Sequence, residues 1–226
     1  MRRVVCIGAH PDDVEIGLGG TIARLVQAGT SVTIVDLTDG EPTPFGTREI
    51  RAREAAEAAA VLGAERVTLS LPNRELADTP EARRELAEVL RDTRPDALFI
   101  PYPEDAHPDH IAASQIALAA RFWSKLTKTD MRGEPHYPAR VYRHMAVHLK
   151  IIRPPSFVHD ITEHLDVKMR AVRCYRSQFE SNPANRHLID AIEASTRMWG
   201  GTIGAVAGEP IFALETLGVS DLGALI

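Results

Sequence analysis

Short apolar runs alternate with segments of helical spacing through the first 125 residues of the chain. The runs are rich in valine and isoleucine and are typical of strands that are buried on both faces. We expect strands at residues 4–9, 31–38, 66–71 and 96–101. We expect helices at residues 19–29, 47–63, 79–93 and 108–126. This alternation predicts an α/β fold with a Rossmann-like, mainly parallel sheet and helices on both faces.

The final hundred residues are less regular. Residues 126–140 are polar and rich in turn formers, and they mark a candidate boundary. Beyond them we expect a strand or strand pair at 140–149 and helices at 161–175 and 184–200. A chain of 226 residues suits one sizeable domain. We therefore expect a single domain over 1–226, with a core at 1–125 and a smaller, irregular C-terminal lobe at 126–226.

Charge and cysteine content argue against several classes of protein. The formal net charge is −5, without the excess of Lys and Arg that attracts nucleic acids. No apolar run reaches the roughly 18 residues of a membrane span. The apolar stretch before His10 is short for a signal peptide, and Cys6 and Cys174 form no CxxC pair. We expect a cytoplasmic protein whose partner is a small molecule, with no nucleic acid or membrane involved.

Polar clusters follow the first and the fourth expected strands. His10, Asp12 and Asp13 come directly after the first strand, within "AHPDD". His107 and the pair Asp109–His110 come after the fourth, within "HPDH". Ligands of parallel sheets bind beyond the carboxyl ends of the strands. The two clusters are therefore expected to meet at one edge of the sheet and form one site.

Histidine and aspartate together suit Zn²⁺ or Fe²⁺. A catalytic zinc needs about three protein ligands and an open position for water. An aspartate that is not a ligand could accept a proton from that water, and a spare histidine could donate to an oxyanion. Asp109 could hold the other nitrogen of that histidine and favour its charged form. Spacing alone leaves open which aspartate binds the metal, and whether His107 or His110 does.

Structural explanations exist for each feature taken singly. His10 could be a core histidine, and Asp12, Asp13 and Asp109 could cap helices. Six ionisable side chains aimed into one crevice would be costly without a ligand, which favours a functional site. The glycines of "GLGG" at 17–20 lack the GxGxxG order, and we expect them to allow a tight turn from strand to helix and close packing.

Two further functions compete with hydrolysis by a metal-activated water. Two histidines and one carboxylate also form the facial triad of non-haem Fe(II) oxygenases. A binding module without catalysis is the third possibility, although the chain retains all six side chains of the two clusters. No GxxxxGK[ST] loop and no GxSxG elbow is present, so the sequence favours neither phosphate cradling nor a serine hydrolase.

The two motifs in this order resemble the signature of the PIG-L/LmbE-like family of zinc-dependent N-acetylglucosaminyl deacetylases. "RxxE" at Arg51–Glu54 and "YRSQF" at Tyr175–Phe179 are also similar to that family. The resemblance implies a hydrolase that acts on a linear amide and a homo-oligomer, trimeric or hexameric. It further implies that residues 126–226 serve substrate binding and oligomerisation.

The resemblance also assigns roles to residues. It implies that Zn²⁺, with Fe²⁺ as the alternative, is bound by two histidines and one aspartate, and that another aspartate is the general base and later the acid. The implied ligands are His10, Asp13 and His110, with Asp12 as base, His107 as oxyanion donor, Asp109 as the residue that orients His107, and Arg51 as a substrate-binding residue.

The branch of the family is suggested by "YxSQF" and by the chain length. These are most similar to the deacetylases of N-acetyl-α-D-glucosaminyl L-malate in bacillithiol biosynthesis. Ala106 and Ala207 depart from that branch, which carries a basic residue and often an aromatic residue there. Chitobiose-, inositol- and antibiotic-linked N-acetylglucosamine are therefore alternative substrates.

Overall fold

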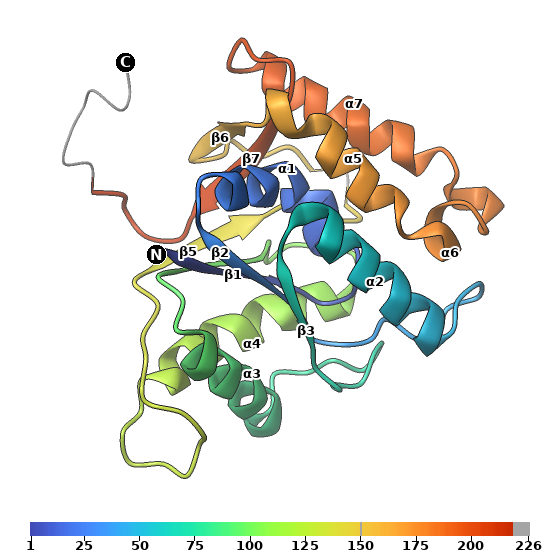
Figure 1. Ribbon diagram of the computed structural model, residues 1–226. Coiled ribbons are helices and arrows are strands. Elements are labelled where there is room, and N and C mark those ends of the chain that lie inside the picture. Colours follow the sequence, from blue (N-terminus) through green and yellow to red (C-terminus); the bar gives the residue numbers. More distant parts are fainter. Residues whose placement is uncertain (150, 219–226) are drawn as a thin grey trace.

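A seven-stranded sheet forms the centre of the molecule in the computed structural model, which describes residues 1–149 and 151–218 (Figure 1). The strand order is β3-β2-β1-β4-β5-β7-β6. The first five strands run parallel, whereas β7 is antiparallel to both of its neighbours. The strands are β1 (Arg3–Gly8), β2 (Ser31–Asp36), β3 (Glu65–Thr68), β4 (Ala97–Pro101), β5 (Arg140–His144), β6 (Phe157–Asp160) and β7 (Gly208–Ala213).

Helices cover both faces of this sheet. The longer helices are α1 (Asp13–Gln27), α2 (Arg48–Leu62), α3 (Pro80–Thr93), α4 (Pro108–Ser124), α5 (Leu165–Arg173) and α7 (Leu188–Gly201). Short helical turns are η1 (Thr162–His164), α6 (Arg176–Phe179) and η2 (Pro183–Asn185). In Figure 1, α3 and α4 lie on one side of the sheet, and α1, α2, α5 and α7 lie on the other.

Alternate side chains of β1 serve two separate cores. Val5 and Ile7 pack in the apolar cluster that includes α3 and α4. Val4 and Cys6 pack in the cluster that includes α1, α2 and α5. This burial on both faces explains the continuous apolar runs of the sequence. The predicted α/β fold with helices on both faces is confirmed.

Helix boundaries follow from local capping. The hydroxyl of Thr47 accepts a bond from the backbone of Ile50 at the start of α2, and Gly63 ends that helix with a φ of 70°. Thr79 caps α3 in the same manner and is followed by Pro80 at the first helical position. These ends lie within a residue or two of the positions expected from the sequence.

The C-terminal segment is more regular than the expected irregular lobe. β5, β7 and β6 extend the same sheet, and β5 pairs in parallel with β4 from Ala97 opposite Arg140 to Pro101 opposite His144. Strands β6 and β7 were not expected from the sequence. β6 has only four residues, of which His159 and Asp160 are polar, so pairing with β7 rather than local pattern defines this strand.

Helix α1 begins earlier than the sequence predicts. It starts at Asp13, so the glycines of "GLGG" lie inside the helix and do not form a turn. A Cβ on Gly17 would lie 2.6 Å from Nδ1 of His144, and one on Gly19 would lie 3.0 Å from Lys168. The expected close packing of these glycines is therefore present, but it brings α1 against His144 and Lys168. Among the described residues, no helix is long and apolar enough to cross a membrane.

Candidate metal centre and active site

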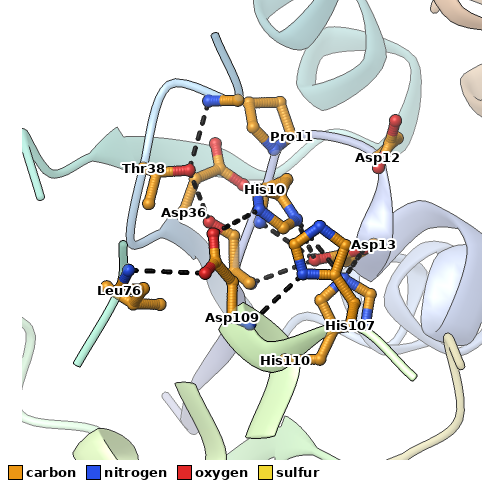
Figure 2. A network of polar contacts seen from close by, with 12 residues as sticks. His10, Pro11, Asp12, Asp13, Asp36, Thr38, Leu76, His107, Asp109 and His110 are labelled. Atoms are coloured by element: carbon orange, nitrogen blue, oxygen red, sulfur yellow. Dashed lines mark hydrogen bonds and ion pairs between the residues drawn. The ribbon is translucent and has the colours of Figure 1, made fainter. Parts of the chain in front are cut away.

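The two polar clusters meet where the strand order of the sheet reverses. β1 continues to α1 on one side, and its neighbour β4 continues to α4, which leaves a crevice between the two loops. The ring centroids of His10 and His110 are 5.3 Å apart, and those of His10 and His107 are 4.7 Å apart. Figure 2 shows these rings grouped with Asp13 and Asp109. The expected convergence of segments a hundred positions apart is present.

Three residues of this group direct potential ligand atoms toward one another, one nitrogen from each histidine and the two carboxylate oxygens of Asp13. Nε2 of His110 lies 3.2 Å from Oδ1 of Asp13 and 3.3 Å from Nδ1 of His10. Nδ1 of His10 lies 3.5 Å from Oδ2 of Asp13. Ligands about 2.0–2.1 Å from a tetrahedral ion are roughly 3.3 Å from one another. The donor set and its spacing therefore fit a divalent metal, and these three residues could hold one.

Carboxylates hold the outer nitrogens of both imidazoles. Nε2 of His10 bonds to Oδ2 of Asp109 at 3.2 Å, and Nδ1 of His110 bonds to Oδ2 of Asp105 at 2.6 Å. This arrangement fixes ring orientation and tautomer in metal sites. Asp105 was missed by the sequence reasoning. The available signal was its place in the segment "PEDAHPDH", between the fourth strand and the second motif, because the other acidic residues of the site also lie in loops that follow strands.

A second group of His10, His107 and Asp109 could also bring three ligand atoms together. In that group Asp109 already accepts bonds from the backbone nitrogens of Arg74 at 2.6 Å and Leu76 at 3.3 Å. Both oxygens of Asp109 are therefore engaged by backbone nitrogens, whereas the backbone bonds to Asp13 go to Oδ2 and leave Oδ1 facing His110. The geometry favours the group of His10, Asp13 and His110.

The electrostatic environment of the cluster favours positive charge. Burial lowers the pKa of His10, but hydrogen bonds to Asp109 and Asp13 outweigh burial and raise that pKa to about 9. Burial also lowers the pKa of His110, but the negative charge of Asp13 and the hydrogen bond to Asp105 outweigh burial and raise that pKa to about 10. A cavity with this surplus of carboxylates is suited to a cation.

His107 differs from these two histidines. Its Nδ1 accepts a bond from the backbone nitrogen of Asp109 at 3.2 Å, so the proton of the neutral ring is on Nε2. Burial, followed by the charges of His10 and His110, lowers the pKa of His107. The expectation that the Asp109 carboxylate holds His107 and favours its charged form is corrected, because that carboxylate bonds to His10 and to backbone nitrogens.

Asp12 occupies an unusual backbone conformation beside the cluster. Its φ is 113°, which is uncommon for any residue except glycine. Arg51 donates to the carbonyl oxygen of Pro11 at 2.6 Å and lies 3.4 Å from Oδ2 of Asp12. Burial raises the pKa of Asp12 to about 6, although Arg51 opposes this effect. Figure 2 shows Asp12 set apart from the rings.

A cavity of about 1110 Å³ opens over the site. Of the seven residues expected to be functional, Asp109 does not line this cavity. The other six do: His10, Asp12, Asp13, Arg51, His107 and His110. His148 also lines the cavity, with its ring 5.3 Å from that of His110. Arg51 is only 2% exposed, so its role as a substrate contact stays a prediction.

The fold and the cluster define a class of α/β protein with a candidate divalent-metal site at the switch point of its sheet. The chain belongs to the PIG-L family, described as GlcNAc-PI de-N-acetylase, which it matches over residues 5–121.

Three relatives illustrate the range of this family. The diacetylchitobiose deacetylase of Thermococcus kodakarensis is 33% identical over 198 residues, covering 79% of this chain and 71% of the relative. A 1D-myo-inositol 2-acetamido-2-deoxy-α-D-glucopyranoside deacetylase of Thermomonospora curvata is 30% identical, covering 62% of this chain and 59% of the relative. The probable N-acetyl-α-D-glucosaminyl L-malate deacetylase 2 of Bacillus cereus is 28% identical, covering 88% and 94%.

Two solved structures match the whole arrangement of elements. A conserved protein of Thermus thermophilus is 39% identical with a TM-score of 0.88, covering 97% of this chain and 98% of that protein. The N,N'-diacetylchitobiose deacetylase of Pyrococcus horikoshii, solved with an inhibitor, is 28% identical with a TM-score of 0.83, covering 100% and 89%.

Proposed function

We propose that this protein is a metal-dependent hydrolase that removes the acetyl group from an N-acetylglucosamine conjugate. The observation that carries the proposal is the group of His10 Nδ1, Asp13 and His110 Nε2, spaced 3.2–3.5 Å apart at the wall of the cavity that also contains Asp12 and His107. The deacetylase activities of the relatives support the reaction type.

His10, Asp13 and His110 would hold the metal ion. Oδ2 of Asp13 accepts bonds from the backbone nitrogens of Ala9 and His10 at 3.0 and 2.9 Å, which fixes this carboxylate. A divalent cation at these residues supplies Lewis-acid polarisation of the amide carbonyl and of the attacking water. We propose zinc as the resident ion, with iron as the alternative, because both accept histidine and carboxylate ligands.

Asp12 acts as the general base and then as the general acid. Its pKa of about 6 allows it to be ionised near neutral pH and to accept a proton from the attacking water. The protonated carboxyl then donates to the departing amine nitrogen. Arg51 holds the peptide between Pro11 and Asp12, and thereby keeps this carboxylate at the cavity wall.

His107 stabilises the oxyanion of the tetrahedral intermediate. The bond from the Asp109 backbone to Nδ1 leaves Nε2 as the donor of the neutral ring. A donor that is fixed before the reaction needs no reorganisation when negative charge develops on the carbonyl oxygen. Asp109 therefore positions His107 through its backbone, and its carboxylate positions His10.

The identity of the group attached to the sugar is a separate and more specific part of the proposal. Malate is supported by the motif resemblance and by the Bacillus cereus relative, of which the alignment covers 94%. A second N-acetylglucosamine is supported by the Thermococcus relative at 33% identity. We also propose a homo-oligomer, which sedimentation of the purified chain tests directly.

Acetate release from these conjugates, measured anaerobically with defined metals, tests the reaction. We expect release with zinc or iron present and none after chelation. We also expect Asp12→Ala to retain the metal while turnover falls by about 10²–10⁴-fold, the range for loss of a general base. Oxygen consumption with an organic co-substrate instead of acetate release would contradict the proposal. Unchanged turnover of Asp12→Ala would remove the base assignment.

A further inference from the structure

Two sequence motifs outside the metal cluster contact each other across the fold. Helix α2 carries "RxxE" at Arg51–Glu54, and the turn into α6, together with α6 itself, carries "YRSQF" at Tyr175–Phe179. The two helices pack together although they are far apart in the sequence (Figure 1). The carboxylate of Glu54 accepts bonds from the backbone nitrogen of Ser177 at 2.8 Å and from its hydroxyl at 2.6 Å. Of these residues, the proposed reaction involves Arg51 alone.

The side chain of Tyr175 is held firmly at its hydroxyl end. Tyr175 is fully buried, and its hydroxyl donates to Oε1 of Glu15 at 2.9 Å. Glu15 is also fully buried and bonds to Arg66 at 2.5 Å. Arg66 in turn donates to both oxygens of Asp36 at 2.6 Å. This network joins α1, β2 and β3, so the charged groups that hold the phenol are themselves paired.

The ring face of Tyr175 is directed at the guanidinium of Arg51. Cζ of Arg51 lies 5.5 Å from the ring centroid, within the range of a cation–π contact. Nη2 of Arg51 donates to the carbonyl oxygen of Pro11 at 2.6 Å, whereas both Nη atoms lie 3.4 Å from Oδ2 of Asp12. Nε of Arg51 has no hydrogen-bond partner within the described part of the chain. One short bond does not fix the plane of a guanidinium, and the ring face is the contact that can do so.

We propose that Tyr175 is a positioning residue for the deacetylation reaction. Its ring holds the guanidinium of Arg51 where it contacts Pro11 and Asp12, and thereby sets the direction of the Asp12 carboxylate at the cavity wall. The proposal rests on the proposed function for the role of Asp12 as base. Tyr175 does not line the cavity, so it acts through Arg51 and not by touching substrate. Asp12 requires such support, because its φ of 113° is unfavourable for an aspartate.

Fluorination of the ring tests this role with little change in the shape of the core. Tyr175→Phe keeps the ring, and pentafluorophenylalanine introduced there by amber suppression removes the negative potential of its face. Acetate release from diacetylchitobiose and from the malate conjugate is measured with zinc-loaded protein. We expect the pentafluoro ring to lower kcat about tenfold relative to Tyr175→Phe, with KM changed less than about twofold, since a misplaced base impairs the chemical step. A difluorinated ring should give an intermediate kcat, and equal kcat for all three rings would overturn the proposal.

The effect of fluorination should depend on Arg51. In the Arg51→Met background, phenylalanine and pentafluorophenylalanine at position 175 should give equal kcat, because no guanidinium remains over the ring. A difference that persists in this background would overturn the proposal. The control position is Tyr142, a partly buried aromatic residue of the same apolar core that does not line the cavity. The same two rings at Tyr142 should give equal kcat, and a matching fall there would assign the effect to the core in general and overturn the proposal.

Arginine side-chain NMR tests the contact without requiring catalysis. In protein labelled with ¹⁵N-arginine, the Nε signal of Arg51 is identified by its loss in Arg51→Met. We expect its proton to exchange with water about tenfold faster with the pentafluoro ring than with phenylalanine, because the guanidinium is held less firmly. Equal exchange rates would overturn the proposal. Faster exchange without acetate release from either substrate would contradict the deacetylase function and leave the contact of Tyr175 with Arg51 in place.

Discussion

At the scale of single residues, the two nitrogens of each central imidazole have separate partners. His10 directs Nδ1 and His110 directs Nε2 toward Asp13, while their outer nitrogens bond to Asp109 and Asp105. This division explains why three aspartates, Asp13, Asp105 and Asp109, accompany the two central histidines. The sequence predicted six members of the group, because they lie in the motifs "AHPDD" and "HPDH" after two strands. It did not predict Asp105, because its contact with His110 depends on how the loop folds back.

Asp105→Asn tests the support of His110. The amide keeps an oxygen for the backbone nitrogens of His107 and His148, but the position facing Nδ1 of His110 is no longer an acceptor. We expect metal affinity to fall about 10–100-fold, as for other residues that support metal ligands. Competition with a chelator measures the change. Glu104→Gln, an exposed neighbour in the same loop, should bind metal like the parent protein, and equal affinity of Asp105→Asn would contradict the assignment.

Arg51→Lys distinguishes positioning of Asp12 from contact with substrate. A lysine ammonium cannot contact the Pro11 carbonyl and the Asp12 carboxylate with the paired geometry of the guanidinium. We expect kcat to fall about tenfold with a smaller change in KM, since a misplaced base impairs the chemical step. Arg48→Lys, on the exposed side of the same helix, should leave both constants unchanged. An effect on KM alone would favour the substrate-contact role.

At the scale of elements, close approach between helix and sheet places the site. Gly17 of α1 packs against His144 at the end of β5, and Nε2 of His144 bonds to the carbonyl of Ile7 in β1 at 2.9 Å. The helix that follows the first cluster is thereby held directly over the strands. Burial on both faces made β1, β2 and β4 predictable, whereas the edge strand β3 is only partly buried. The start of α1 was not predictable, because the low helix propensity of glycine is overridden here by tertiary packing.

Gly17→Ala should destabilise the fold. The added Cβ would lie 2.6 Å from Nδ1 of His144, which is fully buried and has no room to move freely. Overpacking of this kind costs about 1–3 kcal/mol in the free energy of unfolding. Gly201→Ala is the control, because a Cβ at that helical position meets nothing within 4 Å. Denaturant unfolding of both variants measures the difference, and equal stability would show that His144 can be displaced without cost.

At the scale of the whole molecule, the candidate metal centre joins the segments after β1 and β4. Those segments belong to different strand-helix units, and side chains from both contribute potential ligand atoms. A metal that binds only the folded state stabilises it through mass action, by about 4 kcal/mol when its free concentration is 1,000 times the Kd. The order of strands in the sheet, rather than proximity in the sequence, creates this link.

Removal of metal should therefore lower the thermal midpoint of the whole chain. We expect chelation to reduce the midpoint by several degrees and added zinc to restore it, because binding energy contributes to the folded state. Asp13→Asn removes a proposed ligand, so its midpoint should respond little to chelator or zinc. Scanning calorimetry provides the measurement, and an equal response of parent and variant would indicate that zinc acts elsewhere.

Anomalous diffraction from zinc-loaded crystals tests the central claim most directly. The account predicts one strong peak at the zinc edge, within about 2.0–2.2 Å of His10 Nδ1, a carboxylate oxygen of Asp13 and His110 Nε2. A peak bound by His107 and Asp109 instead, or no peak between the two loops, would contradict it.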